Sequence, residues 1–403
     1  MIHTEFAPNE KLLDSILGLK LAIQPWRWRR GKELYNLKRR LKFRFFPQSN
    51  YISLYFTGRA ALHQYLSLLN LNPKDEVMVQ GFTCEAVILP ILKLGLKPVY
   101  VDISKDDFSM TLKNVKKNYS KYTKVLILQH TFGITPKDRG EIFAFAKEKK
   151  IQIIEDLAHG FDLDLYRNSK IKGALLLSFG RSKAFSSVFG GAIVLSDKKM
   201  VQSLKDAEKQ LPNVSFFTLS KINFYKFSTV LVKSTYDFYF GKILHFLLKN
   251  FNLIVPEITK KEKNGVFDNK MLKVFPNLSA ILMLKQLDTF NDVYQRRINN
   301  VKKYNNAFRH LSYSFTAGLI RYPFFVENRQ KTISNAKKHN INLGTWYSQP
   351  VAPLGLDLIK LGYKTGSCPV AEEVCGHIIN LPTDINPNEC NKVIDYISSV
   401  KWK

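Results

Sequence analysis

Between residues 75 and 197 the chain alternates apolar runs with amphipathic segments, and this alternation constrains the fold most strongly. Residues 75–103 indicate strand, helix and strand, and four further runs have the length of strands: 124–130, 151–156, 173–180 and 190–197. Strands that alternate with helical segments predict a mostly parallel sheet wrapped by helices, in the α/β class. Ligands of such sheets bind beyond the carboxyl ends of the strands, where Asp156 and Ser178 stand.

The pattern changes on both sides of this region, which predicts five parts. They are a basic amphipathic N-terminal segment (1–50), a large α/β domain (51–198), an apolar and basic insert (199–275), a long helix (276–311) and a small C-terminal α/β domain (312–403). Pro276 suits the first turn of the long helix, since proline has no N–H to leave unbonded there.

The chain carries a formal net charge of +28, which predicts an anionic partner. Anionic lipid and phosphorylated substrates are the candidates, while nucleic acid is not expected because no recognition helix or RNA-binding signature is present. The four cysteines form no C-x-x-C pair, so we expect neither zinc nor a disulfide framework, but a reducing cytoplasm. We also expect no cleavable signal peptide and no spanning helix, which would need about 18 or more apolar residues.

The stretch SFGRSKAFSSVFGGA (178–192) places Lys183 on a loop directly after a strand, where lysine can serve chemistry or simply stand on a surface turn. The stretch FTGRAALHQYL (56–66) is a glycine-containing turn that opens a helix, which either binds phosphate or is an ordinary capped helix. Asp156 ends a strand, where a carboxylate can hold a ligand or cap the next segment.

Together these pieces supply what pyridoxal phosphate requires. That cofactor needs a lysine amine, a carboxylate that keeps its pyridine nitrogen protonated, and a phosphate site made of a helix N-terminus and hydroxyls. Lys183, Asp156 and Ser178 with the turn at Gly58 match these needs. The pair at 190–191 consists of glycines, which would let backbone pass close to a bound ring.

The ordered motifs along most of the chain resemble the DegT/DnrJ-type family of sugar aminotransferases, which are fold-type-I pyridoxal-phosphate enzymes. The motifs are TGRAAL, PKDEVMVQGFTCEAV, LGLKPVYVDI, HTFG, IIEDLAHG, SFGRSK, GGAIVLSD, YPFFVENR, CPVAEE and INLPTD. The resemblance implies that Lys183 forms the Schiff base and that Asp156 pairs with the pyridine nitrogen.

It further implies that Ser178, Gly58 and Arg59 hold the phosphate. His159 matches a position near the cofactor's phenolic oxygen and the substrate, although a packed or capping histidine stays open. A homodimer is implied as well, because the family builds its site between two subunits.

Three departures from the family pattern stand out. Cys84 occupies the place of an aromatic residue that stacks on the cofactor ring; it either contacts the ring or is a buried core cysteine. The family's Asn-x-Arg before the long helix, which reaches a neighbouring subunit's site, is absent, and Lys270 or Lys273 could compensate. The loop near Tyr347 keeps its tyrosine but lacks the usual histidine, so the sugar preference can differ.

The resemblance predicts transfer of an amino group from an amino acid, with glutamate expected, to a nucleotide-linked keto sugar for surface glycan biosynthesis. One alternative is another pyridoxal-phosphate reaction on a lipid-like or lipid-linked substrate. A second alternative is a non-catalytic membrane-surface protein that retains the fold.

Residues 12–46 and 214–256 mix aromatic and aliphatic side chains with lysine and arginine. This composition predicts reversible, peripheral attachment to an anionic cytoplasmic membrane face, with Trp26, Trp28, Phe238 and Phe246 entering the lipid. The alternative is that the two segments pack on each other or across a dimer.

Overall fold

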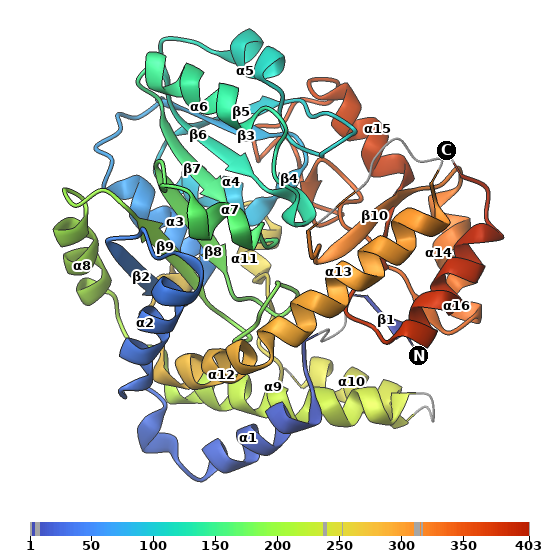
Figure 1. Cartoon of the computed structure of the whole chain (residues 1–403). Helices are drawn as coiled ribbons and strands as arrows, with labels where there is room; N and C mark the ends of the chain where they lie inside the picture. The colour runs from blue at the N-terminus through green and yellow to red at the C-terminus, as the bar shows by residue number, and fades with distance from the viewer. Residues whose placement is uncertain are drawn as a thin grey trace.

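The computed structural model describes residues 2–4, 9–236, 240–251, 253–309, 315 and 317–402 (Figure 1). Its centre is a seven-stranded sheet in the order β2-β9-β8-β7-β6-β3-β5. The strands are β2 (Tyr51–Tyr55), β3 (Glu76–Gln80), β5 (Lys97–Val101), β6 (Thr123–Gln129), β7 (Gln152–Asp156), β8 (Ala174–Ser178) and β9 (Gly191–Leu195). β9 runs antiparallel to β2 and β8, and the other pairs are parallel, so the predicted mostly parallel sheet is confirmed.

Helices cover both faces of this sheet, which explains why its strands are continuous apolar runs. Along β8, Ala174 and Leu176 join the core that includes α3 (Gly58–Ser67) and α4 (Glu85–Lys93). The alternate residues Leu175 and Leu177 join a second core under α2 (Glu33–Phe45) and α12 (Asn277–Asp288). The period of two along a strand thus divides its side chains between two helical layers. Near β6 the same face is covered by α5 (Leu112–Asn118) and α6 (Arg139–Glu148).

The C-terminal part forms a smaller α/β unit. In it, β10 (Arg321–Phe325) pairs antiparallel with β13 (Ile378–Pro382), beside α14 (Arg329–Lys338), α15 (Pro369–His377) and α16 (Pro387–Ser398). The N-terminal strand β1 (Ile2–His3) pairs with β11 (Ile341–Asn342), so the chain begins in this unit. A short parallel pair of β4 (Thr83–Cys84) and β12 (Val351–Ala352) connects the unit to the large sheet.

The single long helix expected over residues 276–311 is wrong. The structure has two helices instead, α12 and α13 (Phe290–Ala307). Thr289 separates them with φ −99° and ψ 5°, a backbone geometry that interrupts the helical hydrogen-bond ladder. Pro276 is the residue that precedes the first turn of α12, not a member of it.

The insert and the N-terminal segment fold mainly as helices. They form α1 (Leu12–Ala22), the short η1 (Pro25–Arg27), α8 (Val201–Gln210), α9 (Phe216–Ser234) and α10 (Phe240–Asn250). In Figure 1, α1, α9 and α10 form a layer along the lower edge, with α12 above α9. A shared core joins α1 to α9 and α12 through Leu21, Leu219, Ile222, Leu278 and Leu282. The alternative that the two segments pack on one another therefore holds for α1 and α9.

This packing corrects part of the predicted membrane contact. Trp28 is 7% exposed and its Nε1 donates to the Leu21 carbonyl at 2.9 Å, so it belongs to the core. The apolar side of α2 is likewise buried. Trp26 and Phe246 remain 71% and 62% exposed, whereas Phe238 lies outside the described residues. Among the described helices, none is long and apolar enough to span a membrane.

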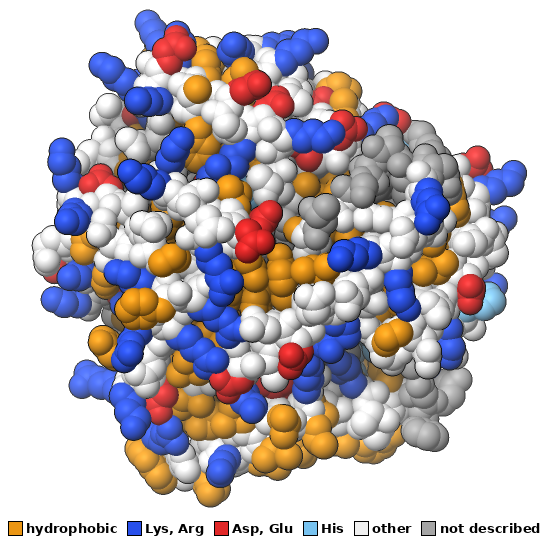
Figure 2. All heavy atoms as spheres, in the orientation of Figure 1, with side chains coloured by type: hydrophobic (Ala, Val, Ile, Leu, Met, Phe, Trp, Pro, Cys, Tyr) orange, Lys and Arg blue, Asp and Glu red, His pale blue; other side chains and the backbone are white. Residues whose placement is uncertain are grey.

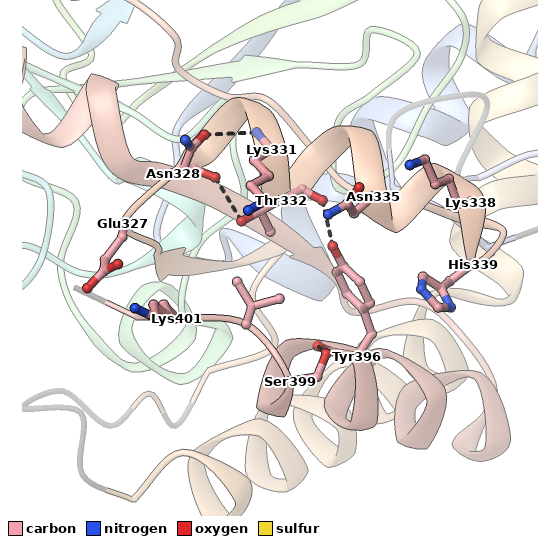
Figure 3. A pocket seen from close by; sticks show the side chains of 11 residues that line it. Glu327, Asn328, Lys331, Thr332, Asn335, Lys338, His339, Tyr396, Ser399 and Lys401 are labelled. Atoms are coloured by element: carbon pink, nitrogen blue, oxygen red, sulfur yellow. Dashed lines mark hydrogen bonds between the residues drawn. The ribbon is translucent and has the colours of Figure 1, made fainter.

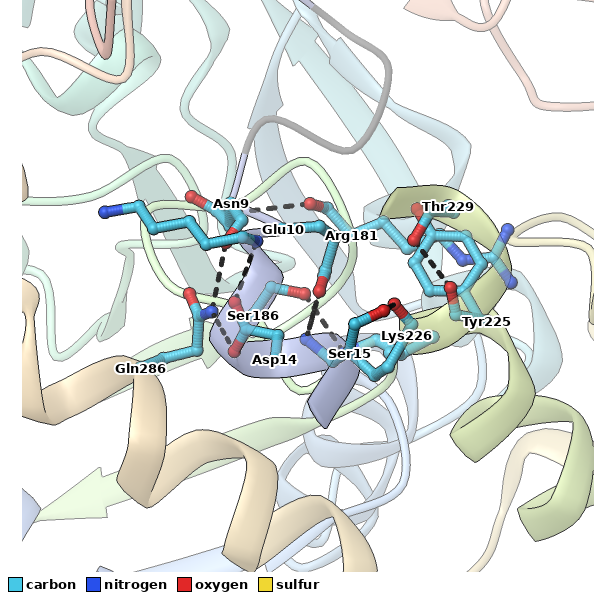
Figure 4. Close-up of polar contacts among 12 residues, drawn as sticks. Asn9, Glu10, Asp14, Ser15, Arg181, Ser186, Tyr225, Lys226, Thr229 and Gln286 are labelled. Carbon is cyan, nitrogen blue, oxygen red and sulfur yellow. Dashed lines mark hydrogen bonds and ion pairs between the residues drawn. The ribbon is translucent and has the colours of Figure 1, made fainter. Parts of the chain in front are cut away.

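A buried ion pair joins α9 to the residues that precede α1 (Figure 4). Lys226 Nζ on α9 donates to both carboxylate oxygens of Glu10 at 2.8 and 2.7 Å, and neither side chain is exposed. Ser15 on α1 donates to the Lys226 carbonyl at 3.2 Å, and Asn223 Nδ2 donates to the Gly18 carbonyl at 2.8 Å. These contacts hold residues 10–18 against α9 of the insert.

Replacing Lys226 with methionine is expected to lower the free energy of unfolding by about 3 kcal/mol, because it leaves the Glu10 carboxyl buried without its cation. Denaturant unfolding measures this loss. The double variant Glu10→Leu/Lys226→Met should recover most of it, and the exposed Lys209→Met should shift stability by no more than about 0.5 kcal/mol. Equal stability of the single and double variants would contradict the assigned role.

Candidate active site

The predicted site residues gather at one edge of the sheet, where the parallel strands end. Gly58 follows β2, Asp156 ends β7 and Ser178 ends β8. The loop that carries Lys183 connects β8 to the antiparallel β9, which begins at this same edge. Because carboxyl ends of parallel strands converge, residues far apart in sequence form one site.

The N-terminus of α3 forms the side of this site that is predicted to bind phosphate. Thr57 caps the helix by accepting a hydrogen bond from the Ala60 N–H at 3.1 Å. The N–H groups of Gly58 and Arg59 stand in the first turn, where a helix offers no acceptor of its own, and such groups bind anions well. A Cβ on Gly58 would lie 3.4 Å from Ser178 Oγ, so this hydroxyl stands beside the same turn.

Glycine at 190 and 191 is explained by close contacts within the chain. A Cβ on Gly191 would lie 2.5 Å from Gly58 Cα, so glycine there lets β9 approach the start of α3. A Cβ on Gly190 would lie 2.6 Å from Phe275 Cε2. We expected this pair to make room for a bound ring. In the structure Gly191 makes room for α3 and Gly190 for Phe275.

The side chain of Arg59 is engaged by the insert and α4. Its Nη1 lies 2.9 Å from Glu262 Oε1 and 3.9 Å from Glu85 Oε1, and its Nη2 donates to the Glu257 carbonyl. Because two carboxylates and a carbonyl surround the guanidinium, Arg59 can offer a phosphate chiefly its backbone N–H.

Lys183 lies at the centre of the site. Burial lowers the pKa of its amine, while the nearby Asp156 carboxylate opposes that shift. A lowered pKa increases the fraction of neutral amine, which is the nucleophilic form. The Nζ atom lies 4.7 Å from the centroid of the Trp346 ring.

The loop around Lys183 is held from two sides. Asn9 Nδ2 donates to the Lys183 carbonyl at 2.7 Å. It also donates to the Arg181 carbonyl at 3.3 Å (Figure 4). The Arg181 guanidinium lies over the Tyr225 ring of α9 at 4.3 Å and donates to the Val255 carbonyl. The N-terminal segment and the insert thus fix the backbone that presents Lys183.

Of the two acids that end β7, Asp156 belongs to the site and Glu155 to the scaffold. Burial raises the pKa of the Glu155 carboxyl, but hydrogen bonds from His130 and Arg139 outweigh this effect and lower the pKa to about 2. Asp156 is 3% exposed; burial raises the pKa of its carboxyl, and the Ala158 N–H and Lys183 oppose this. Successive strand residues point to opposite faces, which separates the two roles.

His159 is buried, and burial together with the charges of Lys183 and Arg321 lowers its pKa well below the ordinary value, so the ring is neutral. Its Nδ1 accepts from the Phe132 N–H at 3.2 Å. The hydrogen of the neutral ring is therefore on Nε2, which lies 2.8 Å from the Tyr347 hydroxyl and donates to it. Tyr347 then keeps its own hydroxyl hydrogen to donate elsewhere in the site.

Cys84 ends β4 and precedes α4, and it is partly exposed. Its Sγ donates to Glu85 Oε2 at 2.7 Å, and burial together with the Glu85 charge raises the pKa of the thiol. Whether Cys84 contacts the cofactor ring stays a prediction.

The segment 270–275 lies next to the site within the same chain. The Lys273 carbonyl accepts from the Phe56 N–H at 3.1 Å, two residues before Gly58, while Lys270 is exposed. Whether Lys270 or Lys273 reaches a second subunit stays a prediction.

Sequence reasoning missed Arg321 and Trp346, which the small domain contributes. Arg321 is 2% exposed, and its guanidinium carbon lies 3.5 Å from the Trp346 ring centroid. Trp346 also stacks on His159, with centroids 4.6 Å apart. The available signal was the arginine within the apolar run LIRYPFFVE, an unusual residue to place in a buried strand.

A groove of about 580 Å³ lies elsewhere, between α14 and the end of α16 (Figure 3). Lys331, Lys338, His339 and Tyr396 are among its lining residues, and the predicted site residues are not. It therefore forms no part of the site around Lys183.

Comparison with known proteins decides the family. The model of the DegT/DnrJ/EryC1/StrS aminotransferase family matches residues 20–218 and 260–398. The chain belongs to this family. It is accordingly a pyridoxal-phosphate-dependent aminotransferase, and the predicted family, fold class and cofactor are confirmed.

Curated relatives in the DegT/DnrJ/EryC1/StrS family include sugar enzymes. The chain is 29% identical over 181 residues to GDP-perosamine synthase of Escherichia coli O157:H7, covering 43% of this chain and 48% of that protein. It is 30% identical over 175 residues to dTDP-4-amino-4,6-dideoxy-D-glucose transaminase of Shigella dysenteriae, covering 43% and 46%. These matches span about half the length of each relative.

Solved structures share the fold over nearly the whole chain. Sugar aminotransferase CalS13 of Micromonospora echinospora matches with TM-score 0.71 and 16% identity, covering 99% of this chain and all of that one. The PLP form of the protein Spr1654 of Streptococcus pneumoniae matches with TM-score 0.69 and 19% identity, covering 97% of this chain and 96% of that one.

The residues at the sheet edge fit pyridoxal phosphate. Gly58 and Gly191 shape the turn at the start of α3, and Ser178 adds a hydroxyl beside it. Asp156 supplies a buried carboxyl and Lys183 an amine. When bound, the cofactor supplies the electron sink that allows a bond at the substrate's amine-bearing carbon to break.

Proposed function

We propose that this aminotransferase moves an amino group from glutamate to a keto sugar carried on a nucleotide, for surface glycan biosynthesis. The observation that carries the proposal is the placement of Lys183, Asp156, Gly58 and Ser178 at one sheet edge in a chain of this family. The names of the two relatives refer to sugars linked to GDP and dTDP, which supports a nucleotide-linked substrate.

Each residue has a role that follows from its surroundings. Gly58 and Arg59 N–H groups and the Ser178 hydroxyl bind the cofactor phosphate, and Asp156 keeps a proton on its ring nitrogen. Lys183 Nζ, with its lowered pKa, accepts the proton that leaves the substrate carbon. The Tyr347 hydroxyl, oriented by neutral His159, donates a hydrogen bond within the site.

Arg321 supports an amino-acid donor. Its buried guanidinium lies against Trp346, which also contacts His159 and Lys183, so a cation stands near the reacting amine. A guanidinium binds a carboxylate through two parallel hydrogen bonds, and every amino-acid donor carries a carboxylate on the carbon next to its amine. Arg321 is therefore assigned to the donor carboxylate.

Arg321→Met is expected to raise KM for glutamate by about 10- to 100-fold, because the donor carboxylate loses a pair of charge-assisted hydrogen bonds. Steady-state kinetics with each substrate varied in turn measure this effect. KM for the keto sugar should change far less, and Arg321→Lys should restore part of the donor affinity. An equal rise in both KM values would contradict a specific role with the donor.

The substrate class is tested by adding keto-sugar nucleotides one at a time to the amine form of the holoenzyme. Conversion back to the aldehyde form of the cofactor with one of them would support the proposal. Failure with every nucleotide sugar would reject it and favour the lipid-linked alternative.

The proposed setting is a homodimer in the cytoplasm. The dimer follows from the family resemblance. A nucleotide sugar and a free amino acid are both substrates of that compartment, and four free cysteines fit it.

A further inference from the structure

The helices α1 and α10 expose large apolar side chains on one edge of the molecule. On α1 and the turn after it these are Leu12, Leu13, Ile16, Leu19, Ile23 and Trp26, between 52% and 73% exposed. On α10 and directly after it they are Phe240, Ile243, Phe246, Leu247 and Phe251, between 42% and 71% exposed. We call this set the α1–α10 face.

The spacing shows that the α1 part is one stripe. Leu12, Ile16, Leu19 and Ile23 follow the period of a helix, so they lie on one side of it. The residues buried in α1 are instead Asp14, Ser15, Gly18 and Leu21, which pack toward α9 and α12. The helix therefore has one side in the core and a second apolar side without cover from the described chain.

Figure 2 shows hydrophobic side chains along the lower edge of the molecule, where Figure 1 places α1 and α10. Exposed apolar patches of this kind mark surfaces that bind another molecule. The α1–α10 face is thus a docking surface rather than a by-product of folding.

The charges around the face select the kind of partner. Residues 11–32 contain six lysines and arginines and one acid, Asp14, which is buried. Residues 240–251 contain two lysines, one histidine and no acid. Two copies of this face would bring like charges together, which disfavours self-association, whereas an anionic surface is complementary to it.

The side chains also suit a lipid boundary. Trp26 is 71% exposed beside the basic run that follows it, and tryptophan prefers the headgroup level of a bilayer. Apolar side chains flanked by lysine and arginine bind anionic membranes without a spanning helix.

We propose that the α1–α10 face docks on an anionic phospholipid membrane. The contact consists of the stripe on α1, Trp26 and the aromatic side of α10. The core residue Trp28 and the buried side of α9 take no part. The site around Lys183 is made of other residues, so catalysis on soluble substrates is independent of this contact.

The test is vesicle co-sedimentation of the full-length holoenzyme. Vesicles of phosphatidylcholine mixed with phosphatidylglycerol should bind the protein at low salt, and binding should weaken with rising salt and with pure phosphatidylcholine. Protein that stays in the supernatant with anionic vesicles at low salt would overturn the proposal.

Matched variants separate the face from general surface hydrophobicity. Leu12→Ser/Ile16→Ser/Trp26→Ser should lower vesicle affinity at least about tenfold, since each apolar group then has less to gain from burial. Leu354→Ser/Ile359→Ser removes two comparably exposed apolar residues of the small domain and should leave binding unchanged. Equal effects of both variants would contradict the assignment.

Aminotransferase activity on soluble substrates checks that each variant is folded. If the parent protein itself showed no such activity, that result would contradict the proposed function and not the membrane contact. Light scattering without vesicles tests whether a second copy of this chain covers the α1–α10 face. If the triple variant turned a dimer into a monomer while the parent bound no vesicles, the face would be an interface between two copies and the membrane proposal would be wrong.

Discussion

Lys183→Ala is expected to lower kcat/KM for transamination at least about a thousandfold. In the proposed function Lys183 supplies both the amine that attaches the cofactor and the base that moves the substrate proton, so its removal abolishes both roles. The purified variant should also lose covalent attachment, so borohydride should no longer fix pyridoxal phosphate on the protein.

Lys172→Ala is the matched control, because Lys172 is an exposed lysine before β8 on the same part of the chain. It should keep both activity and borohydride fixation. Peptide mapping of the reduced parent protein should identify Lys183 alone, and modification of another lysine would contradict its assigned role.

Asp156→Asn is expected to lower kcat by about a thousandfold. An uncharged amide cannot stabilise a protonated ring nitrogen as a carboxylate does, so the cofactor loses much of its capacity to accept electrons. The change is nearly isosteric, and the amide oxygen of the substituted side chain can still accept from the Ala158 N–H, so stability should change little.

The neighbouring acid provides the contrast. Glu155→Gln removes the charge that pairs with Arg139 and His130 in the scaffold. It should lower the free energy of unfolding more than Asp156→Asn does, yet reduce kcat less. Kinetics and denaturant unfolding on both variants measure this, and the reverse order of effects would show that the two roles are misassigned.

The sequence predicted those parts of the fold and the site that depend on local pattern. The strands around 151–156 and 173–180 are continuous apolar runs because helices cover both faces, and their carboxyl ends carry Asp156 and Ser178. The turn at Gly58 was readable because its helix begins with a capping threonine and a glycine.

Contacts between distant segments could not be read in this way. Arg321 and Trp346 enter the site only because the small domain folds against the large one, and Asn9 reaches the Lys183 loop from the start of the chain. Composition alone could not separate Trp28, which is buried, from Trp26, which is exposed, because two neighbouring tryptophans in a basic run look alike.

The central claim is that the site around Lys183 carries out transamination, and the half-reaction with glutamate tests it most directly. Glutamate added to the holoenzyme, with no acceptor present, should convert the absorption band of the protein-bound aldehyde form of the cofactor to that of its amine form. One equivalent of 2-oxoglutarate should form per site, and Lys183→Ala should not show the change. If the holoenzyme binds pyridoxal phosphate on Lys183 yet neither glutamate nor any other amino acid produces the amine form, the account is contradicted.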